Sequence, residues 1–379
     1  MDFEPTETQA QIVELARAVA REVVAPVARE GDRTGRFPEE IVRELGGVGL
    51  LAVSVPEELG GAGAGAVAYV LALMEIAAAD CAVAVTMAVT NMVGDIIARY
   101  GTRAQAERCC PRLASAEWLA GSFALSEAQA GSDSAAMTTR AERRGDRWVL
   151  NGEKQWITSA DRAGVLVTWG RSEPAAGTRG VTAFLVEAGT PGLRIGRHEQ
   201  KMGIRASSTV SVAFEDCELP ESAVLGSPGD GFRIAMSALD GGRTGIAAQA
   251  TGTTRAALEA SVRYAKDRRA FGQPIGAFQA IAFMLADMRT EHDAARLLTV
   301  RAAALKEQGR PYTREASMAK LFASEAAQRA VTKTVQIHGG YGYIDELPVE
   351  RYFRDARVQT IYEGTSEIQR LVIARDLLR

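Results

Sequence analysis

The stretch Ile361-Tyr362-Glu363-Gly364-Thr365-Ser366-Glu367-Ile368-Gln369-Arg370, near the C-terminus, sets a single carboxylate between an aromatic residue and a glycine, directly ahead of a helical pattern. Thr365 is a candidate N-cap, because apolar residues recur at helical spacing after it. A carboxylate held in a loop beside a helix N-terminus can act as a general base. An acidic residue at that place can also do no more than favour the helix dipole. The stretch alone leaves both interpretations open.

Helical patterns fill most of the last third of the chain. Residues 246–267, 278–307 and 315–338 carry apolar residues at helical spacing. Gly339 and Gly340 follow the third of these segments, where a helix C-cap is expected. Together with residues 365–378, these segments predict a C-terminal helical bundle.

The middle third has the two-residue alternation of β strands, and the first third returns to helical spacing. Residues 165–169, 181–186 and 209–214 are predicted strands. Asn151-Gly152 lies between two apolar runs and is predicted to form the type I′ turn of a hairpin. The glycine-rich residues 60–65 predict a turn between helices, because they do not fit the GxGxxG pattern of dinucleotide sites. The predicted order along the chain is α, β, α.

Length and composition indicate a globular chain of more than one domain. The chain has 379 residues and a formal net charge of −3, which gives no reason to expect nucleic acid or an anionic membrane as a partner. Glu75, Asp80 and Asp95 interrupt the apolar residues 66–97, so this region is predicted to form buried helices and not a membrane span.

Cysteines and histidines predict neither disulfides nor a metal site. The four cysteines contain no CxxC pair and are expected to be reduced thiols, and the three histidines are widely separated in sequence. The acidic start, Met1-Asp2-Phe3-Glu4, does not look like a signal peptide. We therefore expect a bacterial cytoplasmic protein, with a mature mitochondrial matrix chain as the alternative.

The segment Tyr362-Glu363-Gly364-Thr365 resembles the C-terminal signature of the acyl-CoA dehydrogenase family, flavoenzymes that desaturate acyl-CoA thioesters. Four further segments between Phe123 and the C-terminus resemble the family in the same order, as do residues 3–27 and 55–58. The resemblance implies an α+β fold with an N-terminal all-α domain (residues 1–119), a middle β-sheet domain (120–229) and a C-terminal four-helix bundle (230–379). It also implies FAD as the cofactor.

The resemblance assigns flavin contacts to five segments. It implies that Trp156 contacts the flavin ring, that Thr158 donates a hydrogen bond near N5, and that Arg268 and Gln279 hold the ADP half. Without the resemblance, a core role for Trp156, a helix stop at Gly339-Gly340 and a structural role for His338 explain the same residues. The full set of implied FAD contacts is Phe123, Leu125, Ser126, Gly131, Ser132, Trp156, Ile157, Thr158, Arg268, Phe271, Gln279, Gln336, Ile337, His338, Gly339, Gly340, Thr365 and Glu367.

The resemblance also places the substrate and the base. Asp240 and Arg243 are three positions apart, which fits either a surface ion pair or a site passed by the pantetheine and thioester. One subgroup of the family carries its catalytic base at the position of Gly242, and glycine cannot act as a base, so the assignment falls on Glu363. The implied substrate contacts are Ser132, Asp240, Arg243, Tyr362 and Gly364.

The function that the resemblance implies is FAD-dependent α,β-dehydrogenation of an acyl-CoA, of short or short-branched chain. Glu363 would remove the α-proton, flavin N5 would accept the hydride, and burial is expected to raise the pKa of Glu363. An electron-transferring flavoprotein is the implied electron acceptor, and a homotetramer built as a dimer of dimers is the implied assembly. Two alternatives stay open, namely a same-fold flavoenzyme with a non-CoA substrate or oxidase activity, and a non-redox CoA-thioester binding protein.

Overall fold

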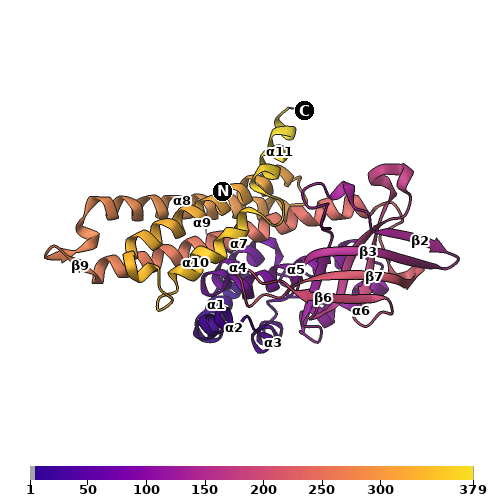
Figure 1. The fold of residues 1–379 in the computed structure, drawn as a ribbon, viewed down its shortest axis with the longest axis horizontal. Helices are drawn as coiled ribbons and strands as arrows, with labels where there is room; N and C mark the ends of the chain where they lie inside the picture. The colour runs from indigo at the N-terminus through magenta and orange to yellow at the C-terminus, as the bar shows by residue number, and fades with distance from the viewer. Residues whose placement is uncertain (1–4, 379) are drawn as a thin grey trace.

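The computed structural model describes residues 5–378; Met1–Glu4, on which the signal-peptide prediction rests, and Arg379 lie outside the described residues. The elements follow the predicted order of helices, strands and helices (Figure 1). Helices extend to Ala114, strands lie between Ala120 and Leu225, and helices resume at Gly231. The predicted α+β fold class is confirmed, and the exact domain limits stay predictions.

The N-terminal helices are α1 (Glu7–Val19), α2 (Ala28–Thr34), α3 (Glu39–Gly47), α4 (Gly65–Ala79), α5 (Cys81–Tyr100) and α6 (Arg103–Ala114). Asp80 ends α4 and caps α5, because its carboxylate accepts the backbone N–H groups of Ala82 and Val83. Among the helices of residues 5–378, α5 alone has the length and composition to cross a membrane, but 83% of its most apolar window is buried in the protein. It is therefore a core helix, as the sequence predicts.

The middle region is one mixed sheet of eight strands. They are β1 (Ala120–Ala124), β2 (Arg140–Arg144), β3 (Arg147–Thr158), β4 (Ala163–Arg171), β5 (Val181–Glu187), β6 (Leu193–His198), β7 (Thr209–Pro220) and β8 (Val224–Leu225). The order is β6-β7-β3-β2-β4-β5-β8, with β1 parallel to β4. The predicted strands at residues 165–169, 181–186 and 209–214 are confirmed as parts of β4, β5 and β7.

The predicted hairpin turn at Asn151-Gly152 is wrong. Both residues lie inside β3, where the pairing with β7 shifts register, and the turn between β2 and β3 falls at Gly145-Asp146 instead. The glycine at 152 has a different cause, because a Cβ there would lie 2.7 Å from the Cα of Thr139. Asn151 is held by Asp216 of β7, whose backbone N–H it accepts at 2.8 Å.

The C-terminal region contains α7 (Gly231–Asp267), α8 (Gln279–Glu307), α9 (Thr313–His338), α10 (Val349–Ala356) and α11 (Ser366–Leu377), with a small hairpin of β9 (Arg269–Ala270) and β10 (Gln273–Pro274) after α7. Buried alanines line the contact between α7, α8 and α9, so the three long helices approach closely. Figure 1 shows α11 leaving the body of the molecule beyond its contact with α9, while α10 lies along α7 and α9.

Helix α7 connects the two ends of the molecule. Its first residue, Gly231, lies against β5, where a Cβ would be 2.6 Å from the carbonyl carbon of Thr182. With 37 residues and a rise of 1.5 Å per residue, α7 is about 55 Å long. Figure 1 shows β9, at the far end of α7, and the β sheet at opposite ends of the long axis.

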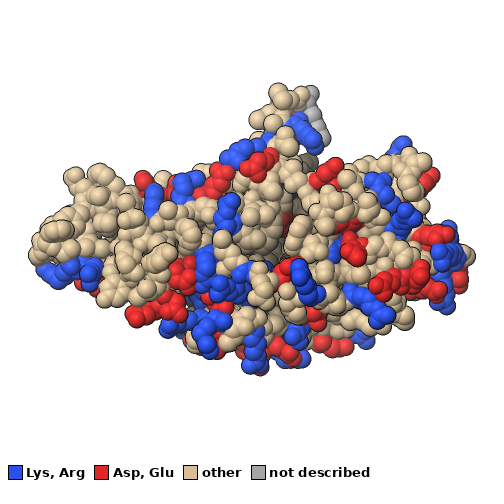
Figure 2. Space-filling model, viewed as in Figure 1, with Lys and Arg blue, Asp and Glu red and all other residues tan. Residues whose placement is uncertain are grey.

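The face drawn in Figure 2 carries acidic and basic side chains interspersed over the β sheet and the N-terminal helices, with larger neutral areas toward the α8–α9 end. This mixture agrees with the net charge of −3 and shows no field of one sign over this face. An anionic ligand therefore needs a local basic site.

Candidate active site

Glu363 lies in the loop between the 3₁₀ turn Arg357–Thr360 and α11. Glu363 and Gly364 have φ angles of +55° and +86°, so two consecutive residues are left-handed, at a cost of about 1–3 kcal/mol for the non-glycine residue. This turn brings the carboxylate against α7, since a Cβ on Gly242 would overlap Glu363 Oε2 and lie 2.7 Å from its Cδ. Glu363 Oε2 is buried and has no hydrogen-bond partner among residues 5–378. A carboxylate oxygen that no other side chain occupies can accept a proton from a substrate, as a general base does.

The surroundings of Glu363 shift its acidity toward neutral pH. Burial raises the pKa of Glu363 to about 7, against the opposing effect of two cations, Arg243 and Lys320. The direction is the one expected from the sequence. A base with a pKa near the working pH combines a useful ionised fraction with useful proton affinity.

Two buried side chains hold the left-handed turn. Lys320 Nζ, on α9, donates to the carbonyl oxygen of Gly364 at 2.8 Å. Gln369, on α11, donates through Nε2 to the same oxygen at 2.9 Å and to that of Glu363 at 3.1 Å. Thr365 caps α11 as predicted, accepting the backbone N–H of Ile368 at 3.4 Å. The loop is therefore fixed on both sides of the carboxylate.

A buried polar network lies beneath Tyr362. Its hydroxyl donates to Gln249 of α7, and Gln249 Nε2 donates to the backbone carbonyl of Cys81 at 2.8 Å. Gln359 donates to Thr253 at 2.9 Å, one turn further along α7. These contacts fasten the loop to α5 and α7, which fixes Tyr362 beside the carboxylate.

Asp240 and Arg243 form a buried pair in the interior of α7, with Arg243 NH1 and Asp240 Oδ1 2.8 Å apart. The side chains are only 12% and 7% exposed, so the surface-pair alternative does not hold. Thr313, at the start of α9, donates to the other carboxylate oxygen at 2.5 Å. Both residues line a cavity of about 1420 Å³ between α7, α8, α9 and α11. Its wall contains more arginines than carboxylates, and the buried Nε of Arg243 has no partner among the described residues.

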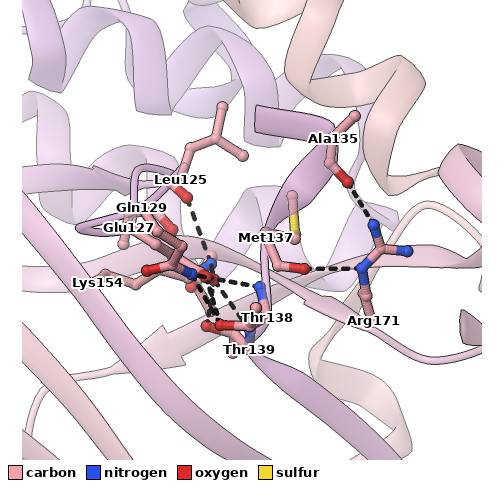
Figure 3. A network of polar contacts seen from close by, with 11 residues as sticks. Leu125, Glu127, Gln129, Ala135, Met137, Thr138, Thr139, Lys154 and Arg171 are labelled. Carbon is pink, nitrogen blue, oxygen red and sulfur yellow. Dashed lines mark hydrogen bonds and ion pairs between the residues drawn. The ribbon is translucent and has the colours of Figure 1, made fainter. Parts of the chain in front are cut away.

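The predicted flavin loop at residues 123–133 is supported from below by a buried ion pair (Figure 3). Lys154 Nζ, on β3, lies 2.9 Å from Glu127 Oε1 and donates to the carbonyl of Leu125 at 3.3 Å. Glu127 also accepts hydrogen bonds from the backbone and hydroxyl groups of Thr138 and Thr139. Burial alone would raise the pKa of Glu127, but Lys154 and these donors lower it to about 2. The loop is thereby held as one rigid unit.

The β-domain residues predicted to contact FAD come together beside this pair. The carbonyl of Ser126 accepts the N–H of Gln155 at 2.9 Å, so Ser126 lies next to Trp156. Trp156 is 54% exposed and has a φ of +60°, which makes the core interpretation of this tryptophan wrong. An exposed indole on a strained, firmly anchored strand fits a flat ligand ring. Ile157 is buried beneath it. Phe123 packs on Trp169, while Gly131 and Ser132 lie exposed at the rim of the loop.

The residues predicted for the ADP half gather at the other end of α7. Arg268, Ile337, His338, Gly339 and Gly340 line one open cavity with Tyr341, and the Arg268 guanidinium lies 5.7 Å from the centre of the Tyr341 ring. His338 stacks on Tyr264, its Nδ1 contacts the Thr334 carbonyl at 2.8 Å, and burial lowers its pKa. Phe271 is 95% exposed at the tip of the β9–β10 hairpin, Gln279 begins α8, and Gln336 precedes the helix end.

The two groups of predicted FAD contacts do not meet within one chain. The length of α7, about 55 Å, separates the Arg268 cavity from the end that lies on β5. Thr365 and Glu367 form a third position, at the first turn of α11 beside Glu363. A single FAD molecule is too short to reach from the β domain to Arg268 of the same chain.

Several site residues carry no recognisable motif and were missed by the sequence reasoning. Lys320, Gln369, Gln249 and the pair Glu127–Lys154 all act through buried polar contacts. Only Lys320 has a local signal, because it interrupts the small residues that α9 repeats at helical spacing on its buried side.

Comparison with known proteins agrees with this geometry. The acyl-CoA dehydrogenase N-terminal, middle and C-terminal domains match residues 6–117, 122–217 and 229–378. The mitochondrial short-chain specific acyl-CoA dehydrogenase of Homo sapiens is 47% identical over 375 residues, covering 98% of this chain and 90% of that protein. Butyryl-CoA dehydrogenase from Megasphaera elsdenii has the same structure, with a TM-score of 0.98, 41% identity and full coverage of both chains.

A structure of the protein PigA in complex with FAD also shares the fold, with a TM-score of 0.96 and 27% identity over 100% of this chain and 99% of that chain. The fit of the site residues to FAD, the three matched domains and the relatives all lead to one assignment. The chain belongs to the acyl-CoA dehydrogenase family, and it is an FAD-dependent oxidoreductase that acts on acyl-CoA.

Proposed function

We propose that this enzyme introduces a trans double bond between the α and β carbons of a short-chain acyl-CoA, with Glu363 as the base that removes the α-proton. The observation that carries the proposal is the buried Glu363 Oε2, which has no partner among the described residues and lies against Gly242 of α7. A carboxylate at the Gly242 position is absent in this chain, which leaves Glu363 as the base for the site.

The residues of the chain supply binding, orientation and proton transfer. Glu363 takes the α-proton onto its carboxylate, so its ionised form starts the reaction and its neutral form ends it. Its backbone N–H has no acceptor among residues 5–378 and suits the thioester carbonyl, where negative charge develops. FAD, when bound beside Trp156 and Thr158, supplies the acceptor for the hydride that leaves the β carbon.

We propose a short acyl chain because large side chains lie close to the part of α7 that faces Glu363. The hydroxyl of the buried Tyr69 of α4 would lie 2.7 Å from a Cβ on Gly245, and the sulfur of Met92 would lie 3.1 Å from a Cβ on Gly242. These two large side chains limit the depth available next to the base. The names of the human and Megasphaera relatives, which specify short-chain and butyryl substrates, support the same size class.

The CoA portion suits the cavity that contains Asp240 and Arg243. Its arginine-rich wall offers planar donors to phosphate groups, and Arg243 is one of the residues that line it. Ser132, at the exposed rim of the flavin loop, is kept as a proposed substrate contact.

We further propose that two copies of the chain complete each FAD site. The β-domain contacts and the Arg268 cavity lie at opposite ends of α7, so one FAD needs the β domain of one chain and the Arg268 end of another. Phe271, Phe283 and Tyr343, all more than 60% exposed, provide apolar surface for such contacts. A homotetramer built from two such dimers, with an electron-transferring flavoprotein as acceptor, is the assembly that we propose.

Anaerobic titration of the purified holoenzyme with straight and branched acyl-CoAs of four to eight carbons tests the function. Bleaching of the flavin absorbance by butyryl-CoA, with weaker bleaching by octanoyl-CoA, is the expected result. Bleaching by no acyl-CoA would refute the acyl-CoA assignment, and preference for octanoyl-CoA would refute the short-chain assignment.

The matched variant is Glu363→Gln, which keeps the size of the side chain and removes the base. We expect it to keep FAD and to be reduced by butyryl-CoA at least 10²-fold more slowly, which is the lower range for loss of a general base. Reduction at the wild-type rate would rule out Glu363 as the base. Light scattering of the holoenzyme tests whether it contains more than one copy of the chain. The flavin absorbance of purified Arg268→Ala tests whether Arg268 holds the cofactor, since this substitution should release FAD.

A further inference from the structure

The buried lysine on α9 is the strongest feature that the proposed function leaves unused. Lys320 is 0% exposed, and the carbonyl oxygen of Gly364 is its one hydrogen-bond partner among residues 5–378. No carboxylate of the described residues lies within 4.0 Å of its ammonium group. A lysine without a close ion-pair partner is rarely fully buried, so the burial of Lys320 needs a physical explanation.

We propose that Lys320 is a positioning residue for the dehydrogenation, which holds the loop of the base through Gly364 and keeps Glu363 ionised with its buried positive charge. This inference rests on the proposed role of Glu363. It adds to that role a second group, on a different helix, that sets the geometry and the ionisation of the base.

The geometric part follows from the left-handed turn. Glu363 has a φ of +55°, a conformation that persists only when surrounding groups hold it. Gly364 directly follows Glu363, and its carbonyl oxygen accepts hydrogen bonds from Lys320 at 2.8 Å and from Gln369 at 2.9 Å. Gln369 comes from α11, which leaves the body, whereas Lys320 comes from the packed interior of α9. Lys320 therefore ties the turn to the rigid part of the fold.

The electrostatic part follows from burial. Burial lowers the pKa of Lys320 to about 7, opposed by Glu363 and, less strongly, by Glu367 and Glu325, while Arg243 of α7 lowers it further. Burial raises the pKa of Glu363, and Arg243 and Lys320 both lower it. A positive charge favours the ionised carboxylate, so removal of the Lys320 charge should raise the pKa of Glu363.

The sign of the pH effect is therefore fixed. The ionised Glu363 is the active form, so the rate of flavin reduction rises with pH through the pKa of this group. Without the Lys320 charge the rise should begin at higher pH. Because the pKa of Lys320 is itself lowered toward neutrality, its charge is present on the acid side of the profile and is lost at high pH. The difference between the enzymes should consequently be largest below pH 7.

The experiment measures flavin reduction by saturating butyryl-CoA in an anaerobic stopped-flow instrument from pH 5.5 to 9. The variants are Lys320→Met, Lys320→Gln, which keeps a donor without the charge, and Lys320→Arg, which keeps the charge. Lys333→Met is the matched control, because Lys333 lies on the same helix and pairs with Asp287 at the surface.

We expect the acid limb to move up by about one pH unit in Lys320→Met and Lys320→Gln, the lower end of the effect of a nearby opposite charge. The rate at pH 6.5 should then fall about tenfold, and the loss should shrink toward pH 9. Lys320→Arg should restore the position of the limb, and Lys333→Met should leave the whole profile unchanged.

An unshifted limb in the uncharged variants would overturn the proposal, even together with a uniform loss of rate at every pH, because a merely structural lysine would produce that loss without the shift. If Lys320→Met does not retain FAD, the result for Lys320→Gln decides in its place.

If no acyl-CoA reduces the wild type, the proposed function fails by itself. Lys320 is then tested by the pH titration of the oxidised flavin absorbance, where the Glu363 step is the one that Glu363→Gln removes. That step must move to higher pH in Lys320→Gln, and an unmoved step refutes the inference.

Discussion

Replacing Glu363 by glutamine should stabilise the folded enzyme above neutral pH, although the same change suppresses activity. Burial raises the pKa of Glu363 from 4.5 to about 7, so the folded protein holds this proton more tightly than the unfolded chain does. As the pH rises from about 4.5 through about 7, the unfolded state loses the proton first, and the stability of the wild type falls. Glutamine does not titrate and therefore lacks this loss.

The magnitude follows from the size of the shift. A change of about 2.5 pKa units at 1.36 kcal/mol each corresponds to about 3 kcal/mol at pH values well above 7. Between pH 5 and pH 8 the free energy of unfolding of the wild type should fall by about 2.5 kcal/mol relative to that of Glu363→Gln, because part of the effect is already present at pH 5. For 379 residues this corresponds to a difference of about 3 °C in the midpoint of thermal unfolding.

The assay is thermal unfolding of both proteins at pH 5 and pH 8, at equal protein concentration and with excess FAD, so that binding contributes equally. The change in unfolding midpoint between pH 5 and pH 8 is compared in the two proteins. The difference between these two changes reports the ionisation of Glu363 and cancels the cost of burying an amide, which does not depend on pH. A difference of zero would show that Glu363 titrates normally in the folded protein, and the account of the base given above would then be wrong.

Four further substitutions test neighbouring parts of the site. Gly242→Ala should keep FAD but slow flavin reduction at least tenfold, because the new Cβ overlaps the Glu363 carboxylate; an unchanged stopped-flow rate would contradict the placement of the base. Lys154→Met should destabilise the protein by about 3–5 kcal/mol in urea unfolding and lower its FAD content, since it strands a buried carboxylate. Adding Glu127→Gln should recover part of that loss, and strictly additive effects would show that the two side chains do not act as a pair. Thr365→Ala should cost about 1 kcal/mol through loss of the α11 cap, with a measured change near zero counting against the cap.

Local patterns in the sequence were sufficient for the fold, whereas the choice of Glu363 as the proposed base needed the resemblance to the family as well. The helical periods, the alternating strands and the cap at Thr365 each depend on residues a few positions apart, which a linear reading can detect. The acidity of Glu363 was also predictable in direction, because a single carboxylate among apolar neighbours is expected to be hard to ionise.

Contacts between distant segments could not be predicted in the same way. Asn151-Gly152 has the composition of a tight turn, yet the glycine serves the close approach of Thr139, which directly precedes β2. Glu127 and Lys154 are 27 residues apart, and Lys320 reaches the Gly364 carbonyl across 44 residues. Such pairs depend on packing, and polar residues of this kind are ordinarily expected at the surface.

Helix α7 is one continuous helix, so the positions of three of its glycines relative to the segments that they contact cannot change independently. Gly231 lies on the sheet, Gly242 faces the Glu363 carboxylate, and at Gly252 a Cβ would lie 2.9 Å from that of Ala77. One residue inserted between these glycines would turn everything beyond it by about 100° and advance it by 1.5 Å. Residues with side chains would then lie at the close contacts that the glycines now occupy, where a Cβ has no room. Insertions and deletions among relatives should accordingly be confined to the loops, while the number of residues between these three positions of α7 stays constant.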